Sequence, residues 1–245
     1  MIGPPNSGKS SILNELTNAK PDIADYPFTT RIPLPGMMPF ENILIQLVDL
    51  PPISPEFTEG WLAGMLRITS AALFIVDMSN PNVLDEIEMV RKFMENHRIF
   101  LVKQKPEKVE DPRLAFVKTL MVGTKYDMPS APDNFSTIKE LYRQYFRVIP
   151  MSIHSLEMIE ELKREIFDLL EIIRIYSKVP GKSPDKSKPF VVSAGSTVMD
   201  VAREIHQDFA NTLRYARVWG SQKYDGQRVN RDYILADEDI LELHI

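Results

Sequence analysis

Residues 3–10 bring together the groups that binding of a phosphate chain requires. They follow the P-loop pattern, with Gly3, Gly8, Lys9 and Ser10 at the fixed positions, and the apolar spacing of residues 11–16 is that of a helix. In such a loop, backbone N–H groups and the helix N-terminus bind phosphate oxygens, the lysine reaches the outer phosphates, and the serine hydroxyl binds Mg²⁺. A chance glycine-rich turn is the alternative, so later parts of the chain decide the interpretation.

Two further stretches carry groups that could complete a magnesium site. Residues 25–31 read Asp-Tyr-Pro-Phe-Thr-Thr-Arg, an irregular loop from which a threonine hydroxyl could reach the metal and the outer phosphate. A surface loop without a ligand is the alternative. Residues 43–50 predict an apolar strand that carries Asp49 at its end. A carboxylate at the carboxyl end of a parallel strand could hold Mg²⁺ through water, unless it only terminates the strand in a turn.

The sequence Thr-Lys-Tyr-Asp at residues 124–127 follows another buried strand and predicts a site for a base. A rigid carboxylate at Asp127 can accept hydrogen bonds from both the N1–H and the exocyclic N2–H of guanine, a pair of donors that adenine lacks. The aliphatic stem of Lys125 would cover the ring. Further along the chain, Ser152 and the backbone N–H of Ile153 are expected to contact the carbonyl edge of the base.

The order of elements predicts a doubly wound α/β domain with a mostly parallel sheet over residues 1–176. A linker rich in lysine, proline and serine follows at residues 177–188, and residues 189–245 are expected to form a small α+β domain. A P-loop normally follows a buried strand of roughly five residues, yet only two residues precede this one. We expect a truncated first strand or a misplaced start, unless another segment fills that position.

The composition is that of a globular protein and excludes several other classes. Of 245 residues, 44% are hydrophobic and 26% are charged, and no long apolar run or signal peptide is present, which predicts a cytoplasmic protein. The absence of cysteine excludes disulfides and thiolate metal sites. The four histidines show no metal-ligand spacing, and acids such as Glu86 and Glu88 are interpreted as solvated helix faces. The net charge of −5 gives no general attraction to nucleic acid or membrane.

The C-terminal part contains a local cluster that could bind RNA. Acidic residues outnumber basic ones from Lys188 onward, so no general positive field is expected there. Basic and aromatic side chains nevertheless alternate in one stretch, and such a mixture can stack on bases and pair with phosphates. The candidates are Arg217, Trp219, Lys223, Tyr224 and Arg228. A half-buried sheet with solvated charges explains the same residues equally well.

Five motifs, in their order and spacing, resemble those of the Obg and developmentally regulated (DRG) GTP-binding proteins. They are residues 3–11, 25–30, 49–52, 124–127 and 152–153. The C-terminal part, with Ala-Arg-Val-Trp-Gly at 216–220 and Lys-Tyr-Asp-Gly-Gln-Arg-Val at 223–229, is similar to the TGS domain that ends the DRG branch. The resemblance implies a P-loop GTPase domain followed by a small β-grasp, ubiquitin-like TGS domain.

The resemblance also implies a translation-associated GTPase that binds GTP or GDP with Mg²⁺. Ribosomal or tRNA-like RNA would be the partner of the TGS domain, with no membrane contact, and the oligomeric state is left open. Thr30 is favoured over Thr29 as the switch ligand, and Asn6 resembles an asparagine that holds K⁺ in relatives.

These inferences together give a set of expected site residues. Phosphate-binding residues are expected at Gly3, Asn6, Ser7, Gly8, Lys9, Ser10 and Ser11. Guanine-binding residues are expected at Thr124, Lys125, Asp127, Ser152 and Ile153. The expected magnesium ligands are Ser10, Thr30 and Asp49, and the expected catalytic residues are Lys9, Asn6 and Thr30.

Three positions depart from the family pattern, whereas Ile53 follows it. Pro52 replaces a glycine whose N–H contacts the γ-phosphate. Ile53 is apolar, as in the hydrophobic-substituted class of relatives, and cannot orient water as a glutamine would. We therefore expect slow hydrolysis that K⁺ stimulates. Thr124 replaces an asparagine, and Ile153 replaces an alanine and crowds the base pocket. Two alternatives stay open, namely a guanine-nucleotide-binding scaffold deficient in hydrolysis and an ATPase that uses the same loop.

Overall fold

The computed structural model describes residues 1–17, 33–54, 60–222 and 224–244. Contacts divide the chain into two compact units, of which the first comprises Met1–Phe40 and Leu44–Leu170 and the second Glu41–Ile43 and Glu171–Ile245. The switch segment predicted at residues 25–31, with Thr29 and Thr30, lies outside the described residues, as does Lys223.

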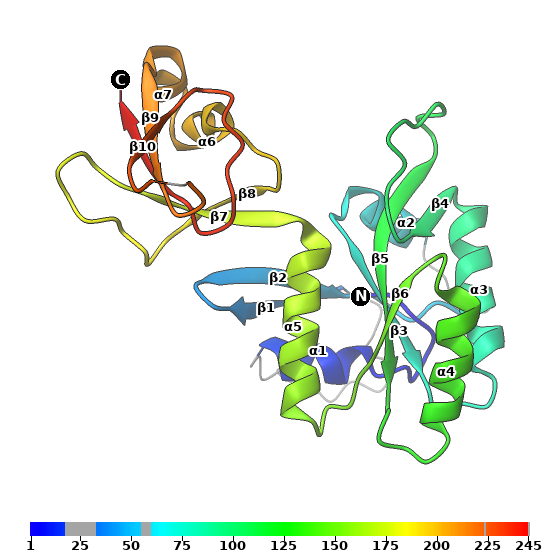
Figure 1. Cartoon of the computed structure of the whole chain (residues 1–245). Helices are drawn as coiled ribbons and strands as arrows, with labels where there is room; N and C mark the ends of the chain where they lie inside the picture. Colours follow the sequence, from blue (N-terminus) through cyan, green and yellow to red (C-terminus); the bar gives the residue numbers. More distant parts are fainter. Residues whose placement is uncertain (18–32, 55–59, 223, 245) are drawn as a thin grey trace. The chain divides into compact units, whose positions relative to one another are not determined.

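The first unit is built on a mostly parallel sheet (Figure 1). Its strands are β1 (Leu34–Phe40), β2 (Ile43–Asp49), β3 (Ala72–Asp77), β4 (Ile99–Val102), β5 (Ala115–Thr124) and β6 (Arg147–Pro150). The second half of β5 pairs in parallel with β3 and β6, and its first half pairs in parallel with β4. β1 and β2 form a separate hairpin. All residues of β3 are buried, as expected for a parallel strand covered on both faces.

Met1 and Ile2 take the position between β2 and β3 where a first strand is expected. The N–H of Ile2 donates to the carbonyl of Leu73 (2.9 Å), and the Ile2 carbonyl accepts from the N–H of Ile75 (2.8 Å). On the other side, the N–H of Leu50 donates to the carbonyl of Met1 (3.2 Å). Met1 and Ile2 therefore bridge β2 and β3 through backbone hydrogen bonds. The loop that follows them consequently lies at the carboxyl ends of both strands.

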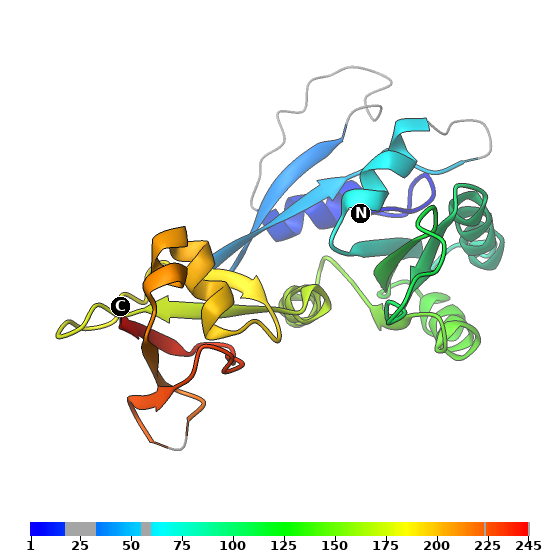
Figure 2. The same ribbon diagram turned by 90° about the horizontal axis from the view of Figure 1, so that it is seen from above.

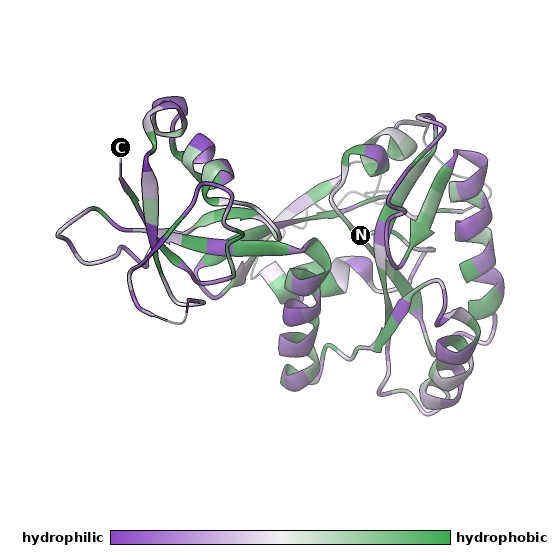
Figure 3. Cartoon of the chain, turned by 45° about the horizontal axis from the view of Figure 1, so that its top comes forward, coloured by the Kyte–Doolittle hydropathy of each residue, from purple (hydrophilic) through white to green (hydrophobic). Residues whose placement is uncertain are grey.

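Helices cover both faces of this sheet. They are α1 (Lys9–Thr17), α2 (Gly60–Ile68), α3 (Val83–Asn96), α4 (Ala131–Tyr142) and α5 (Leu156–Leu170). α2, α3 and α4 share one hydrophobic core with Phe74 and Met121, while α1 and α5 contact each other and pack against β1. In Figure 3 the strands are mainly hydrophobic and the helices carry hydrophilic outer faces. The doubly wound α/β prediction is confirmed.

The second unit is a small mixed sheet with two helices. Its elements are β7 (Ile172–Ser177), β8 (Phe190–Ser193), α6 (Val198–Ile205), α7 (Gln207–Thr212), β9 (Tyr215–Trp219), β10 (Gln227–Val229) and β11 (Ile240–His244). The strand order is β10-β9-β11-β7-β8, and among these pairs only β7 and β11 run parallel. Both helices lie on the same side of the sheet (Figure 2), where they cover Ala216 and Val218. The alternate residues of β9 therefore point to the opposite face.

The two units meet in the sequence at residue 171, whereas the sequence predicts a first domain that ends at residue 176. That prediction assumes one helix across residues 156–173. The helix ends at Leu170, Glu171 adopts a φ of 50°, and β7 then pairs with β8 and β11. The expected linker at residues 177–188 thus corresponds to the connection between β7 and β8.

Sequence reasoning also did not identify β1, which contains Pro35 and Pro39 and pairs with β2 alone. Proline is tolerated at such an edge because the strand has one side without ladder hydrogen bonds. None of the helices in the described ranges is both long enough and apolar enough to cross a bilayer.

Candidate functional site

Residues 3–8 form a tight loop whose backbone explains the residue types. Gly3 has a φ of 155°, and a Cβ atom at this position would lie 2.2 Å from the carbonyl oxygen of Ile75. Gly8 (φ 93°) and Asn6 (φ 59°) also adopt positive φ angles. Conformations of this kind are costly for most residues and are found where the surrounding structure requires them. The glycines of the motif are therefore needed for the shape of the loop itself.

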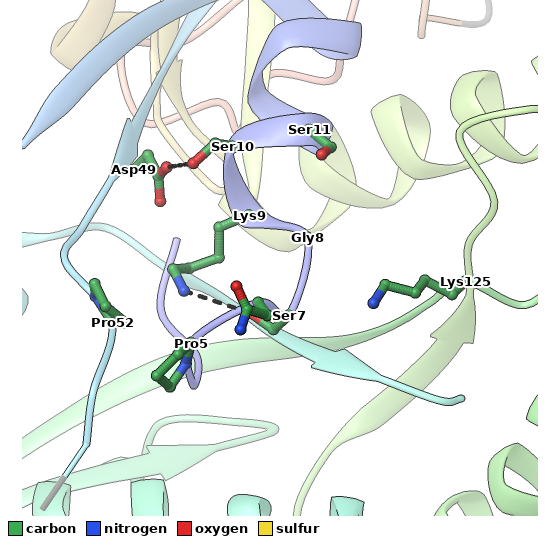
Figure 4. Close-up of a pocket in the computed structure, with 10 residues that line it drawn as sticks. Pro5, Ser7, Gly8, Lys9, Ser10, Ser11, Asp49, Pro52 and Lys125 are labelled. Atoms are coloured by element: carbon green, nitrogen blue, oxygen red, sulfur yellow. Dashed lines mark hydrogen bonds between the residues drawn. The ribbon is translucent and has the colours of Figure 1, made fainter. Parts of the chain in front are cut away.

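Lys9 begins α1 and turns its amine back over the loop (Figure 4). Nζ donates to the carbonyls of Pro4 (2.8 Å) and Gly3 (3.2 Å) and to Ser7 Oγ (3.4 Å). Burial lowers the pKa of Lys9 to about 8, against a smaller opposing effect of the charge on Asp49. A buried cation whose hydrogen bonds go to neutral acceptors gains strongly from an added anion such as a phosphate.

Ser10 and Asp49 meet beside this loop. Ser10 Oγ donates to Asp49 Oδ2 (2.6 Å), and the other carboxylate oxygen, Oδ1, is buried without a hydrogen-bond partner among the described residues. A buried carboxylate oxygen in that state is costly unless a cation or a donor meets it. Hydroxyl and carboxylate oxygens are ligands that Mg²⁺ prefers. These two side chains therefore fit a magnesium ion.

A pocket of about 550 Å³ lies over the loop. It is lined by Pro5, Asn6, Ser7, Gly8, Lys9, Ser10, Ser11, Asp49, Pro52 and Lys125, and Figure 4 shows these side chains around it. The predicted phosphate-binding residues line this pocket together, apart from Gly3, which contributes to the fold of the loop. The pocket combines a helix N-terminus, a lysine and the Ser10–Asp49 pair, which together suit a phosphate chain.

A second pocket, of about 220 Å³, adjoins the first. It is lined by Gly8, Ser11, Ile12, Thr124, Lys125, Asp127, Met128, Met151, Ile153 and His154. Gly8, Ser11 and Lys125 belong to both pockets, so one elongated ligand can occupy the two together. The lining is mainly apolar beside the carboxylate of Asp127, which suits a flat ring with one polar edge.

Asp127 is oriented by Ser152. Ser152 Oγ donates to Asp127 Oδ1 (2.6 Å) and accepts from the N–H of His154 (3.2 Å). The hydrogen bond from Ser152 lowers the pKa of Asp127, so its carboxylate is charged at neutral pH. The sequence predicts that Ser152 contacts the base; in the structure its hydroxyl contacts Asp127, the carboxylate predicted to bind guanine. Ile153 lies beside it, 39% exposed, at the pocket wall.

Thr124 connects the two pockets. Its buried hydroxyl lies 2.7 Å from the carbonyl oxygen of Ser7 and 3.1 Å from that of Val76. It thereby ties the phosphate-binding loop to the strand that leads to Asp127. An asparagine side chain has two N–H donors where threonine has one O–H, so the two carbonyls share a single donor here.

Pro52 and Ile53 differ in their surroundings. Pro52 lines the phosphate pocket and has no N–H to donate. Ile53 is 1% exposed, belongs to the hydrophobic core, and donates its N–H to the carbonyl of Gly3 (3.1 Å). Ile53 therefore supports the loop from the core and offers the pocket no polar side chain.

Asp77, which contacts Lys125 beside the two pockets, was missed by sequence reasoning. It ends β3 as Asp49 ends β2, so the rule that identified Asp49 could have identified it. The pocket residues Met128 and Met151 were also missed, because no sequence pattern marks them. Glu86, interpreted as solvated, is half-buried, and this burial raises its pKa.

The RNA candidates of the second unit lie on β9, β10 and the turn between them. Arg217 and Arg228 are exposed and stand directly opposite each other in the antiparallel ladder. Trp219 is packed on its own unit, because the amine of Lys178 lies 4.4 Å from its ring and a Cβ atom at Gly226 would lie 2.9 Å from it. The geometry therefore gives Trp219 a packing role rather than an open stacking surface.

Tyr215 and His244 extend the same face; the sequence places Tyr215 in the basic and aromatic cluster, and His244 is interpreted from the sequence as structural or exposed. The Tyr215 ring lies between the guanidinium of Arg228 (4.0 Å) and the ring of His244 (4.4 Å), because β10 and β11 flank β9. Tyr224 is 65% exposed in the turn, and Lys223 lies outside the described residues. The face of the sheet away from the helices thus carries a row of stacked basic and aromatic side chains.

Comparison with protein families finds one match in each of the two units. Residues 1–105 match the family described as 50S ribosome-binding GTPase, and residues 173–245 match the TGS domain. The second match begins inside β7, in agreement with the structural boundary at residue 171.

Several proteins are similar to the chain over its whole length. A GTP-binding protein of Methanocaldococcus jannaschii is 30% identical, over 100% of this chain and 77% of the relative. The developmentally-regulated GTP-binding protein 1 homolog of Dictyostelium discoideum is 27% identical, over 99% and 81%. Ribosome-interacting GTPase 1 of Saccharomyces cerevisiae is 28% identical, over 99% and 80%.

A solved structure supports the fold. The GTP-binding protein from Pyrococcus horikoshii is 18% identical, with a TM-score of 0.63 over 99% of this chain and 98% of that one. Together, the two family matches and the full-length relatives establish that the chain belongs to the DRG-type GTP-binding proteins, which combine a P-loop GTPase domain with a C-terminal TGS domain.

Proposed function

We propose that the chain is a slow, K⁺-stimulated GTPase that regulates a ribosome- or RNA-associated process. The observation that carries the proposal is the continuity of the two pockets, which share Gly8, Ser11 and Lys125. The larger pocket has the charges for a phosphate chain, and the smaller one has the carboxylate for guanine. A single guanine nucleotide satisfies both.

The proposed roles follow from the contacts of each residue. Lys9 carries a buried positive charge to the outer phosphates, and Ser10 and Asp49 hold Mg²⁺, which neutralises phosphate charge when it is bound. Thr30, from the segment outside the described residues, is proposed to complete the magnesium site. Asp127 selects guanine, with its carboxylate held by Ser152.

Slow turnover is proposed because residues 52 and 53 lack two groups that assist GTP hydrolysis, namely a backbone N–H and a polar side chain. Pro52 offers no N–H to the γ-phosphate, and Ile53 is buried in the core. Asn6 lines the mouth of the phosphate pocket and is exposed, so its side-chain oxygen can serve as one ligand of a K⁺ ion. A cation at this position would supply positive charge beside the phosphates.

Single-turnover GTP cleavage in K⁺ and in Na⁺ tests this function. We expect K⁺ to raise the rate constant by roughly tenfold or more, because added positive charge stabilises the transferred phosphoryl group. Asn6→Ala should remove the difference between the two ions. Equal rates in K⁺ and Na⁺ would exclude the role of the ion, and no cleavage in either would favour the hydrolysis-deficient scaffold.

Pro52→Gly separates the slow GTPase from the scaffold. The new N–H should strengthen binding of GTP relative to GDP by roughly 10- to 100-fold, since a hydrogen bond to a charged group is worth about 1.5–3 kcal/mol. Pro180→Gly, in the exposed connection between β7 and β8, controls for the added backbone freedom. An unchanged ratio of GTP to GDP affinity would show that residue 52 does not limit the discrimination between GTP and GDP.

A second function, binding of RNA by the TGS domain, is supported by Arg217 and Arg228. Like charges directly opposite each other in a ladder destabilise a sheet, and a bound phosphate removes that cost. Glu242 lies next to Arg217 on β11, but its carboxylate is bonded by Lys178 and His244. The relative from Saccharomyces cerevisiae is named as ribosome-interacting, and we propose a ribosomal or tRNA-like RNA as the partner here.

Binding to ribosomes and to a structured RNA, measured across a salt series, tests the second function. The double variant Arg217→Ala with Arg228→Ala should weaken binding and reduce the slope of log K against log salt by about 1.5, as loss of two phosphate contacts requires. Arg203→Ala, which removes an exposed arginine of α6 on the covered side of the sheet, is the matched control. Equal effects of both variants would contradict this surface.

A further inference from the structure

Asp77 lies at the carboxyl end of β3 and forms a close ion pair with Lys125. Asp77 Oδ2 accepts a hydrogen bond from Lys125 Nζ (2.5 Å), and Oδ1 accepts from both the N–H (2.8 Å) and the hydroxyl (2.7 Å) of Ser79. The carboxylate is therefore fixed on both oxygens. Burial raises the pKa of Asp77, but the hydrogen bonds from Lys125 and Ser79 outweigh this effect and keep the pKa below its ordinary value.

Lys125 has two unusual features. Its backbone adopts a φ of 55°, in the left-handed region that is unfavourable for a residue other than glycine. It also lines both pockets, so its stem runs along the boundary between the phosphate end and the base end. A lysine side chain has many rotamers of similar energy, and nothing in its own chemistry selects this path.

We propose that Asp77 is a positioning residue for nucleotide binding, which holds the stem of Lys125 along the boundary between the two pockets. The inference rests on the guanine-nucleotide site described above. The stem then covers the base and the P-loop without losing rotamer entropy when the nucleotide binds. Asp77 itself does not touch the nucleotide, and its effect passes through Lys125.

A double-mutant cycle with a fluorescent GDP analogue tests this inference. Asp77→Asn keeps the shape of the side chain and removes its charge, and Lys125→Met keeps most of the stem and removes the amine. We expect each single variant to raise Kd by roughly tenfold, and the double variant to bind no more weakly than Lys125→Met, since residues that act through one another are not additive. The rise in Kd should be the same for GDP and GTP, because both nucleotides would contact the part of the pocket formed by Lys125.

Asp111→Asn is the matched control, because it removes another paired carboxylate, bonded to Arg113 on an exposed loop remote from the pockets. Additive effects of the two variants, or an unchanged Kd in Asp77→Asn, would overturn the inference. Should Asp77→Asn fail to fold, Lys125→Arg compared with Lys125→Met gives the same test, since an arginine can still pair with Asp77. Failure of the unmodified protein to bind the analogue would instead refute the nucleotide site itself.

Discussion

The two ends of the nucleotide site are built in different ways. At the phosphate end of the proposed complex, the ligand would meet backbone N–H groups of a loop whose shape is set by Gly3 and Gly8, together with the charges of Lys9 and Asp49 and the hydroxyl of Ser10. At the base end, the ligand would meet side chains: a carboxylate on an apolar wall of methionine and isoleucine. The first depends on backbone conformation and the second on side-chain placement.

This difference explains why substitutions are tolerated at the base end, although Pro52 departs from the family pattern at the phosphate end. The P-loop residues match the pattern because a Cβ at Gly3 would collide with the backbone of β3. The base end tolerates Thr124 and Ile153, because a side-chain hydrogen bond or an apolar contact can be supplied by another residue type of similar reach. Loss of the P-loop charge should therefore weaken binding of every nucleotide, and variants at the base end should change selectivity or reduce affinity in part.

Lys9→Met should have the largest effect. It removes the buried positive charge and keeps the apolar stem, and the loss of charge-assisted bonds of about 1.5–3 kcal/mol each should weaken GDP and GTP by roughly 100-fold or more. Equilibrium titration with a fluorescent guanine nucleotide measures this effect. Lys139→Met, on the exposed face of α4, should leave Kd unchanged. A Lys9→Met protein with near-normal Kd would contradict the assignment of the phosphate end.

Asp127→Asn should change the base rather than abolish binding. An amide cannot accept from both guanine N–H groups, so guanine nucleotides should weaken by roughly 100-fold, while xanthine, which carries a carbonyl in place of the N2 amine, gains a hydrogen bond from the amide. Competition of GDP, XDP and ADP with a fluorescent guanine nucleotide measures this change in base preference. Asp133→Asn, in the exposed first turn of α4, is the matched control. An ADP affinity equal to that for GDP in the unmodified protein would favour the ATPase alternative.

The parts of the fold and site that follow from local sequence could be predicted, and those that depend on tertiary pairing could not. The P-loop, Asp49 and Asp127 follow from motif and strand-end position. β7 was missed because its buried Arg174 interrupts an apolar run next to a helix, and only pairing with β8 and β11 shows that it is a strand. Strand-end position could have identified Asp77, but its pairing with Lys125 and the stacking of Tyr215 on His244 could not be predicted, because these partners are distant in sequence.

Thr124→Val should weaken nucleotide binding by an intermediate amount, because Thr124 at the base end is bonded to the loop at the phosphate end. The substitution is nearly isosteric and removes the hydroxyl that bonds the carbonyls of Ser7 and Val76, which leaves buried acceptors unsatisfied at a cost of about 1–3 kcal/mol. We expect roughly tenfold weaker binding of GDP, GTP and XDP alike. Thr124→Asn, which restores two donors, should bind at least as well as the unmodified protein. A change confined to the base preference would contradict the role of Thr124 as a tether.

The smallest expected effect is the pH dependence, which again separates the two ends. Burial lowers the pKa of Lys9 from 10.5 to about 8, so above that pH the folded, ligand-free protein loses a proton that the unfolded chain retains. The contribution of Lys9 to folding stability therefore rises as pH increases from about 8 towards 10.5. A nucleotide favours protonated Lys9, so its affinity should move in the opposite direction and fall by about fourfold between pH 7 and pH 8.5.

Lys9→Arg, whose side chain stays charged throughout this range, should bind with a Kd that changes little over the same interval. At the base end, the hydrogen bond from Ser152 keeps the pKa of Asp127 low, so this carboxylate does not titrate near neutral pH. A decline that persists in Lys9→Arg would therefore show that a group other than the P-loop lysine titrates. A decline that disappears in Lys9→Arg and remains in Asp127→Asn would assign the proton to the phosphate end.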